Sequence, residues 1–184
     1  MLEVEVKYRY AEWDTLRAKL SALGATAAEI RTEVDHYFNA PDRDFARTDE
    51  ALRIRRIGDA NCITYKGPKT DAATKTRTEI ELPVEAGDAG ADTATRLLTA
   101  LGYRPVLVVA KTREVWTFTR DGFTVEACLD DAGVVGKFVE LEVLAEPDRF
   151  EAAKAAVLRT AAELGLTDVE RRSYLAMHLQ ARGA

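Results

Sequence analysis

Charged and apolar residues alternate along several segments of this chain, and this period of two constrains the fold more than any other feature. In residues 2–8 (LEVEVKY) the charged side chains fall on one face of an extended strand and the apolar side chains fall on the other. The same alternation occurs at residues 52–55 (LRIR), 77–82 (RTEIEL), 111–113 (KTR) and 139–143 (VELEV). One strand of this kind is ordinary in a sheet with one solvated face. Five in one chain instead predict a closed sheet whose charged faces converge on its interior.

Eight segments have the composition and periodicity of strands, and four have those of helices. We expect strands at about 2–9, 34–38, 51–57, 62–67, 76–84, 106–118, 123–130 and 137–144, and helices at about 11–23, 92–101, 147–164 and 169–180. Residues 67–75 are expected to form a mobile loop, and residues 85–91 a linker. Many short strands with few helices predict an α+β fold: a closed eight-stranded antiparallel β-barrel with the helices packed outside it.

The two halves of the chain resemble each other weakly. Residues 20–26 (LSALGAT) are similar to residues 97–103 (LLTALGY), an offset of about 77 residues, and each half reads as a strand, a helix and three further strands. This repeat favours a barrel with pseudo-twofold symmetry. Because 184 residues suit one domain, we expect a single domain over residues 1–184 with halves at about 1–84 and 85–184.

Charge and hydropathy exclude several classes of protein. The net charge of −5 argues against a protein that coats nucleic acid, because such proteins usually carry net positive charge. The N-terminus is charged from residue 3, unlike a signal peptide, and no apolar run approaches the length of a membrane span. We therefore expect a cytoplasmic protein with no membrane or nucleic-acid partner and with Cys62 and Cys128 as free thiols. The sequence leaves open whether it forms a homodimer.

The predicted interior carries charges of both signs, and this combination suits one kind of ligand. A barrel of about eight strands has room for side chains or one small ligand. Arginine and lysine match phosphate oxygens, and carboxylates match divalent cations that also contact phosphates. The interior therefore predicts a complex of a metal ion with a triphosphate. Because the chain has no Walker-type glycine loop, side chains would bind the phosphates.

An ordered set of motifs covers nearly the whole chain. It comprises Glu3-x-Glu5-x-Lys7, Leu52-Arg53-x-Arg55, Tyr65-Lys66-Gly67-Pro68, Arg77-x-Glu79-x-Glu81, Lys111-x-Arg113, Asp130 with Gly136-x-Phe138-x-Glu140-x-Glu142, and Arg172-Ser173-Tyr174. In these residues the chain resembles the CYTH superfamily, the group of the class IV adenylate cyclases and thiamine triphosphatases. Residues 101–113 (LGYRP…KTR), 35–37 (DHY) and 172–174 (RSY) resemble the cyclase branch. Residues 131–136 (DAGVVG) depart from the family, which often has Leu-Gly there.

The charge pattern and the resemblance together imply roles for individual residues. The expected ligands of Mg²⁺ or Mn²⁺ are Glu3, Glu5, Asp130, Glu140 and Glu142, and the expected catalytic residues are Glu3, Glu5, Asp130 and Glu140. The expected substrate-binding residues are Lys7, Arg53, Arg55, Lys66, Arg77, Lys111 and Arg113. Alternatively, the acidic residues form a solvated strand face and the basic residues only pair with them. Glu79 and Glu81 are open between the two kinds of role, and His36 and His178 are assigned none.

The resemblance implies a metal-dependent enzyme that acts on a triphosphate, and the cyclase-like residues favour conversion of ATP to cyclic AMP and pyrophosphate. The first alternative is a triphosphatase that hydrolyses thiamine triphosphate, tripolyphosphate or a nucleoside triphosphate. The second is a non-catalytic module that binds polyphosphate. The acidic set favours an enzyme, because a phosphate-binding module needs only the basic residues.

Overall fold

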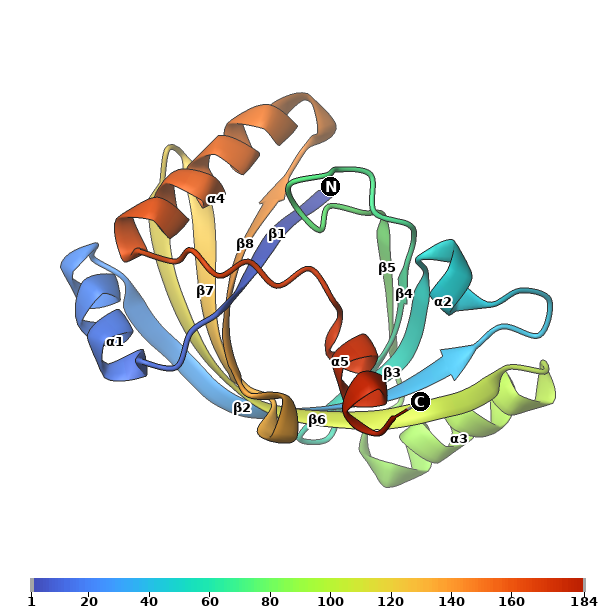
Figure 1. Ribbon diagram of the computed structural model, residues 1–184. Coiled ribbons are helices and arrows are strands. Elements are labelled where there is room, and N and C mark those ends of the chain that lie inside the picture. The colour runs from blue at the N-terminus through green and yellow to red at the C-terminus, as the bar shows by residue number, and fades with distance from the viewer. Residues whose placement is uncertain (1, 184) are drawn as a thin grey trace.

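The computed structural model describes residues 2–183, which form one curved antiparallel sheet with helices around it (Figure 1). The strands are β1 (Leu2–Arg9), β2 (Thr26–Asn39), β3 (Ala51–Ile57), β4 (Ala60–Lys66), β5 (Glu79–Val84), β6 (Arg104–Arg120), β7 (Phe123–Asp131) and β8 (Lys137–Ala145). The helices are α1 (Trp13–Ala22), α2 (Phe45–Thr48), α3 (Gly87–Ala100), α4 (Phe150–Leu164) and α5 (Tyr174–Ala181), with single 3₁₀ turns at Gly133–Val135 and Pro147–Arg149. No helix in this part of the chain is both long and apolar enough to cross a membrane.

The sheet is an open half-barrel, and the full closure predicted from the sequence is not confirmed. The strands run in the order β1-β8-β7-β6-β2-β3-β4-β5, which leaves β1 and β5 as its edges. Within residues 2–183, an isolated bridge between Glu3 and Arg77 joins these edges in place of a ladder. The segment that leads into β5 adds one backbone hydrogen bond of 2.8 Å, from Lys75 N to Glu5 O. These contacts narrow the gap between the edges without extending the sheet across it.

The strand order contains two equivalent units. If β1 is exchanged with β5, β2 with β6, β3 with β7 and β4 with β8, the strand order becomes the same order read in reverse. Each unit begins with an edge strand, continues through a helix into a long central strand, and ends with a hairpin. The long strands β2 and β6 pair with each other and join the two units.

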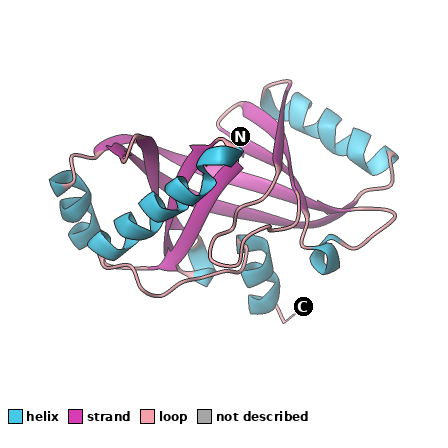
Figure 2. Cartoon of the chain, turned by 90° about the horizontal axis from the view of Figure 1, so that it is seen from above, coloured by secondary structure: helices cyan, strands magenta, loops and turns pink. Residues whose placement is uncertain are grey.

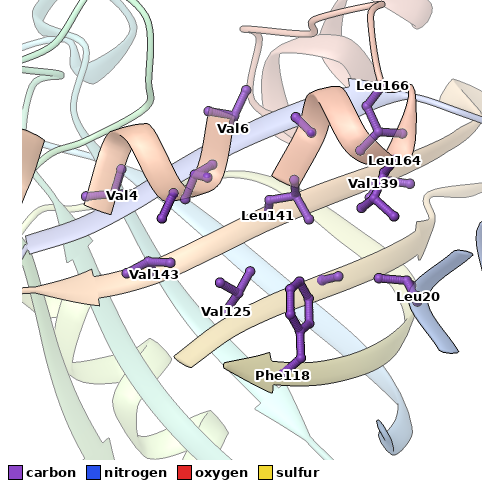
Figure 3. Packing of buried hydrophobic residues seen from close by; sticks show 14 of the residues in the cluster. Val4, Val6, Leu20, Phe118, Val125, Val139, Leu141, Val143, Leu164 and Leu166 are labelled. Atoms are coloured by element: carbon purple, nitrogen blue, oxygen red, sulfur yellow. The ribbon is translucent and has the colours of Figure 1, made fainter. Parts of the chain in front are cut away.

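Helices cover the outer face of the sheet at both ends. Helices α1 and α4 pack on the outer side chains of β1, β7 and β8, including Val4, Val6 and Leu141 (Figure 3). Helix α3 covers Phe38, Leu52 and other apolar residues of β2 and β3. Burial of each such side chain contributes about 1.5–3 kcal/mol. Helices α1, α3 and α4 lie outside the curved sheet (Figure 2), as predicted, whereas α5 packs on its concave side, where Tyr174 and Met177 join a cluster with Val109 and Phe138. Because the apolar faces turn toward the helices, the alternating charged residues face inward.

Three element boundaries differ most from those predicted, and the short helix α2 was not predicted. Strand β2 begins at Thr26 and not near residue 34. The prediction missed its first half because that half carries polar side chains and lacks an apolar run. Helix α3 begins at Gly87, within the predicted linker, where the Asn61 side chain holds the chain through 2.8 Å hydrogen bonds to Glu85 O and Gly87 O. The last helix begins only at Tyr174, because the preceding residues bond to the backbone of β1.

The segment between α4 and α5 runs beside β1. Arg9 N donates a hydrogen bond of 2.8 Å to Asp168 O, and Glu170 N donates one of 2.8 Å to Lys7 O. Ser173 then caps α5, because its side chain accepts a hydrogen bond from Ala176 N. This path carries the C-terminal segment across the opening of the half-barrel and brings Tyr174 to its inner side (Figure 1).

Candidate active site

A cavity of about 230 Å³ lies on the concave face of the sheet. Its lining is mostly charged and comes from seven of the eight strands, from the segment before β5 and from the start of α5. The lining residues are Glu3, Glu5, Lys7, Arg31, Tyr37, Ala51, Arg53, Arg55, Thr64, Lys66, Lys75, Arg77, Glu79, Glu81, Lys111, Arg113, Glu140, Glu142, Ser173 and Tyr174. The cavity therefore gathers every site residue predicted from the sequence except Asp130, which lies behind its wall.

Two buried carboxylates of β2 hold the arginines of β3. Arg55 Nε lies 2.7 Å from Asp35 Oδ1, and Arg55 Nη2 lies 2.9 Å from Glu33 Oε2. Arg53 Nη1 lies 3.2 Å from Asp35 Oδ2. Although burial opposes ionisation, Arg53 and Arg55 lower the pKa of Asp35, and Lys111 with the neighbouring arginines holds the pKa of Glu33 well below its ordinary value. Both carboxylates are therefore ionised and keep the guanidinium groups in place.

Asp130 holds the second set of basic side chains, Lys111 and Arg113 of β6. Its carboxylate is fully buried and accepts four hydrogen bonds of 2.7 Å, from Lys111 Nζ, Arg113 Nε, Arg113 Nη2 and the Tyr174 hydroxyl. Lys7 and Lys111 also place their ammonium groups 4.0 and 4.7 Å from the centroid of the Tyr174 ring, within the range of cation–π attraction. With both oxygens engaged by these donors, Asp130 positions the basic side chains from behind.

Glu140 lies at the centre of the basic residues of the cavity. Arg113 bonds to it directly, Lys75 Nζ lies 3.5 Å from its Oε1 atom, and Lys7 Nζ lies 3.9 Å from the same atom. Although burial opposes ionisation, Lys111, Lys75 and Arg113 hold the pKa of Glu140 well below its ordinary value. Burial and the nearby Lys75 lower the pKa of Lys7 to about 7. The site thus disfavours the charged form of Lys7.

Lys75 is a site residue that the sequence analysis missed. It lies in the segment predicted to be a mobile loop, yet it is 8% exposed and its Nζ atom lies 2.6 Å from Glu5 Oε1. The loop is tied down on its outer side, where Asp71 accepts a 2.7 Å hydrogen bond from Lys154 of α4. Its polar composition resembles that of an exposed loop, because sequence cannot distinguish solvation by water from solvation by a charged cavity.

Three carboxylates converge where β1 and β8 meet. Glu3, Glu5 and Glu142 each place one oxygen so that the three atoms lie within 4.8 Å of one another. Burial, reinforced by Glu3 and Glu140 against the opposing charge of Arg113, raises the pKa of Glu142 to about 8. Such a cluster of oxygen ligands fits a hard divalent cation such as Mg²⁺ or Mn²⁺. Of the five predicted metal ligands, the fold groups these three, whereas Glu140 and Asp130 face ammonium and guanidinium groups.

The remaining predicted residues surround this acidic cluster. Lys66 Nζ lies 3.0 Å from Glu3 Oε2 and 2.8 Å from Glu79 Oε2. Arg77 Nη1 donates a hydrogen bond of 3.3 Å to Gly67 O, which folds the segment before β5 toward the cavity. Glu81 also lines the cavity and lies 3.5 Å from the Thr64 hydroxyl. His36 is exposed on the outer face of β2 and takes no part in the site.

Glu33, Asp35 and Tyr174 also contribute in ways that the sequence analysis did not assign. The signal for the two β2 carboxylates was present, because residues 29–37 (EIRTEVDHY) alternate in period two like the other charged strands. Recognising it required extending β2 upstream of residue 34. Tyr174 was part of a recognised motif, but its contact with Asp130 joins residues 44 positions apart.

The fold and the site together define a class of protein, an open antiparallel half-barrel whose concave face is lined by charged side chains. The chain matches the model of the CYTH domain over residues 1–174 and belongs to the CYTH family. It is 34% identical to a candidate adenylate cyclase of Methanocaldococcus jannaschii over 95% of this chain and 97% of that protein. It is 30% identical to adenylate cyclase CyaB of Aeromonas hydrophila over 94% of this chain and 86% of that protein.

Solved structures share this fold along the chain. The PH1819 protein of Pyrococcus horikoshii is 38% identical with a TM-score of 0.84, covering 98% of this chain and 99% of that one. A Hippeastrum protein named as a candidate adenylyl cyclase, and described with a dominant triphosphatase activity, is 17% identical with a TM-score of 0.63, covering 98% and 96%. At that identity the second likeness concerns the fold alone.

Proposed function

We propose that this protein is a divalent-metal-dependent enzyme that binds ATP in the half-barrel and converts it to cyclic AMP and pyrophosphate. The observation that carries the proposal is a cavity lined by charges of both signs. It holds a cluster of three carboxylates and two sets of basic side chains, those of β3 and those of β6. An empty interior of this kind is costly, because charges lose hydration on burial. A complex of a triphosphate with a metal ion complements both signs at once.

The basic side chains are proposed to bind the phosphate oxygens. Arg53, Arg55, Lys111 and Arg113 are already held by buried carboxylates, so a ligand meets guanidinium and ammonium groups that need little reorganisation. At about 230 Å³ the cavity is smaller than the roughly 300–1,000 Å³ of pockets for drug-sized ligands. The cavity suits the size of the triphosphate chain, and the nucleoside would extend out of it toward solvent.

Glu3, Glu5 and Glu142 are proposed to hold Mg²⁺ or Mn²⁺. When bound, the ion neutralises phosphate charge and lowers the pKa of a nearby hydroxyl group. The chain's own contribution begins at Glu5, whose Oε1 atom is 2.6 Å from Lys75 Nζ. If Glu5 held the ion, the Lys75 ammonium would be available to the phosphates. The same residue thus balances the charge of the site before and after the ligand binds.

The reaction itself needs positioning and charge stabilisation more than covalent help from the protein. The ribose 3′ oxygen forms a bond to the α-phosphorus, and the bond from that phosphorus to the oxygen bridging toward the β-phosphate breaks. Pyrophosphate leaves with that bridging oxygen, and the hydroxyl proton passes to solvent. Lys111, Arg113 and Lys75 would stabilise the charge that develops on the phosphates.

A triphosphatase is the second candidate. The same cavity would then direct water at the terminal phosphorus of ATP, thiamine triphosphate or tripolyphosphate. Two observations support cyclisation more than hydrolysis: the cyclase-like motifs of the sequence and the names of the Methanocaldococcus jannaschii and Aeromonas hydrophila relatives. Fold likeness carries little weight here, because one fold hosts several chemistries. A non-catalytic polyphosphate-binding module fits less well, because it has no need for the Glu3, Glu5 and Glu142 cluster.

Product analysis tests the proposal. The purified full chain is incubated separately with ATP, thiamine triphosphate and tripolyphosphate, each with Mg²⁺ and with Mn²⁺, and the products are separated by chromatography. We expect cyclic AMP and pyrophosphate from ATP. Orthophosphate with ADP, and no cyclic nucleotide with either metal, would replace the cyclase by the triphosphatase. Tight binding of tripolyphosphate without turnover of any substrate would favour the non-catalytic module.

A further inference from the structure

Three glutamates lie side by side across three neighbouring strands of the inner face. Glu142 of β8 is directly opposite Glu5 of β1 on one side and Glu126 of β7 on the other. Like charges directly opposite each other in a sheet are destabilising. Arg113 Nη1 reaches Glu142 at 3.2 Å and Lys75 reaches Glu5, but within residues 2–183 no ion pair reaches Glu126. Glu126, at this end of the row, therefore has no cationic side chain beside it in the described part of the chain.

A buried thiol lies beside that end of the row. Cys128 follows Glu126 by two residues on β7, so its side chain is on the same inner face. The residue is 0% exposed, and among the described residues its sulfur makes no hydrogen bond. Cys128 Sγ and one oxygen each of Glu126 and Glu142 lie within 4.8 Å of one another. The cysteine thus contributes a buried ligand atom, without a hydrogen-bond partner, to the acidic pair.

The structure assigns Glu126, Cys128 and Glu142 to a second cation site, distinct from the Glu3, Glu5 and Glu142 cluster and suited to a borderline-soft divalent ion such as Zn²⁺ or Cd²⁺. Oxygen ligands alone select hard ions, whereas a thiolate shifts the preference toward Zn²⁺ and its softer congeners. On binding, a sulfur–metal bond forms and the thiol proton passes to solvent.

The charge balance of the site supports this assignment. A thiolate and two carboxylates carry three negative charges, and a divalent ion neutralises two of them. The Arg113 guanidinium, 3.2 Å from Glu142, offsets part of the third, because Arg113 also bonds to Asp130 and Glu140. Because Glu142 belongs to both groups of ligands, an ion in the second site shares a ligand with the first. The inference does not rest on the proposed function, because binding at this site is measurable without any substrate.

Optical titration with Cd²⁺ tests the site. A Cd²⁺–thiolate bond produces charge-transfer absorption in the ultraviolet, so the metal-free full chain is titrated with Cd²⁺ and the band recorded. We expect the band to saturate at one equivalent in the wild-type protein and in Cys62→Ser, which removes the other thiol from β4. Cys128→Ser should remove the band. Glu126→Gln should keep the thiol but weaken Cd²⁺ affinity by about tenfold or more, whereas Glu151→Gln, on the exposed surface of α4, should leave it unchanged.

Each alternative outcome contradicts the proposal. Absence of a thiolate band in the wild-type protein would show that Cys128 is only a packed core residue. A band that persists in Cys128→Ser and disappears in Cys62→Ser would move the binding to β4. Circular dichroism verifies that Cys128→Ser is folded. If that variant does not fold, Glu126→Gln decides, because unchanged Cd²⁺ affinity in it would remove Glu126 from the site and overturn the assignment.

Discussion

The hydroxyl group of Tyr174 donates a hydrogen bond of 2.7 Å to Asp130 Oδ2, the same atom that lies 2.7 Å from Lys111 Nζ. Tyr174 is the first residue of the C-terminal helix, whereas Asp130 and Lys111 lie on neighbouring strands of the sheet. The contact therefore couples the docking of α5 to the position of a basic residue in the cavity. Removal of the C-terminal helix would therefore loosen Asp130 and, with it, Lys111, which is proposed to bind phosphate.

The first prediction concerns this hydroxyl group. Tyr174→Phe keeps the ring and removes one of four donors to a buried carboxylate, so we expect a loss of about 1.5–3 kcal/mol in the free energy of unfolding. Urea unfolding followed by circular dichroism measures it. Tyr103→Phe is the matched control, because within residues 2–183 its hydroxyl group makes no hydrogen bond. Equal stability of the Tyr174→Phe and Tyr103→Phe variants would show that the contact with Asp130 contributes nothing.

The second prediction concerns the metal ion. In the proposed site, carboxylates and phosphates are both negatively charged and need a metal ion between them. Excess EDTA should therefore abolish turnover of every triphosphate, and Mg²⁺ or Mn²⁺ added beyond the chelator should restore it. The measurement is product formation before and after metal addition, with circular dichroism to establish that the chelator does not unfold the protein. Undiminished turnover in EDTA would remove the metal from the proposed mechanism.

The third prediction concerns the inner acidic residues. Glu5→Gln and Glu140→Gln keep the shape of the side chain but lose its charge. Each should lower kcat/KM by at least about a hundredfold, because Glu5 belongs to the proposed metal site and Glu140 orders the surrounding ammonium groups. Glu151→Gln on the outside of α4 is the control. Near-normal rates in either inner variant at modest Mg²⁺ would reassign that residue to a purely structural role.

The fourth prediction compares two adjacent arginines of β3 that face opposite sides of the sheet. Arg55 lines the cavity, whereas Arg56 pairs with Asp88 of α3 on the outside. Arg55→Ala should weaken ATP affinity by about ten- to a hundredfold, because a hydrogen bond to a charged group contributes roughly 1.5–3 kcal/mol. Arg56→Ala should leave affinity unchanged. Calorimetric titration measures both, and equal affinities in the two variants would place the phosphates elsewhere.

The fifth prediction concerns the pH dependence of stability. Glu170 accepts hydrogen bonds from Arg172 and Arg9, and these lower its pKa from about 4.5 to about 2. A lowered pKa in the folded state stabilises the protein above the unfolded-state pKa, and this stabilisation is lost as the pH falls. Wild type should therefore exceed Glu170→Gln in Tm at neutral pH, and the difference should shrink as the pH falls from about 4.5 toward 2. Thermal unfolding across this range measures it, and a difference independent of pH would contradict the ionic origin.

The alternation of charged and apolar residues determined much of the architecture. Val4 and Val6 face the helices because Glu5 and Lys7 face the interior, and this relation follows from the pleat of a strand wherever the strand lies. The motifs determined the family, and the repeat at residues 20–26 and 97–103 indicated the two-unit strand order. These properties were accessible because they depend on neighbours two or a few positions apart in the chain.

Only the tertiary structure decided how the charges are divided. Sequence placed Asp130 and Glu142 in one acidic set, yet the fold surrounds Asp130 with four donors and brings Glu142 to Glu3 and Glu5. It also buried Lys75, which the sequence left in a loop, and joined β1 to the segment before β5 by an isolated bridge where closure was expected. The physical reason is that a charged side chain takes its role from the groups that replace water around it. In this protein those groups come from residues as far apart as Glu5 and Lys75, which are 70 positions apart.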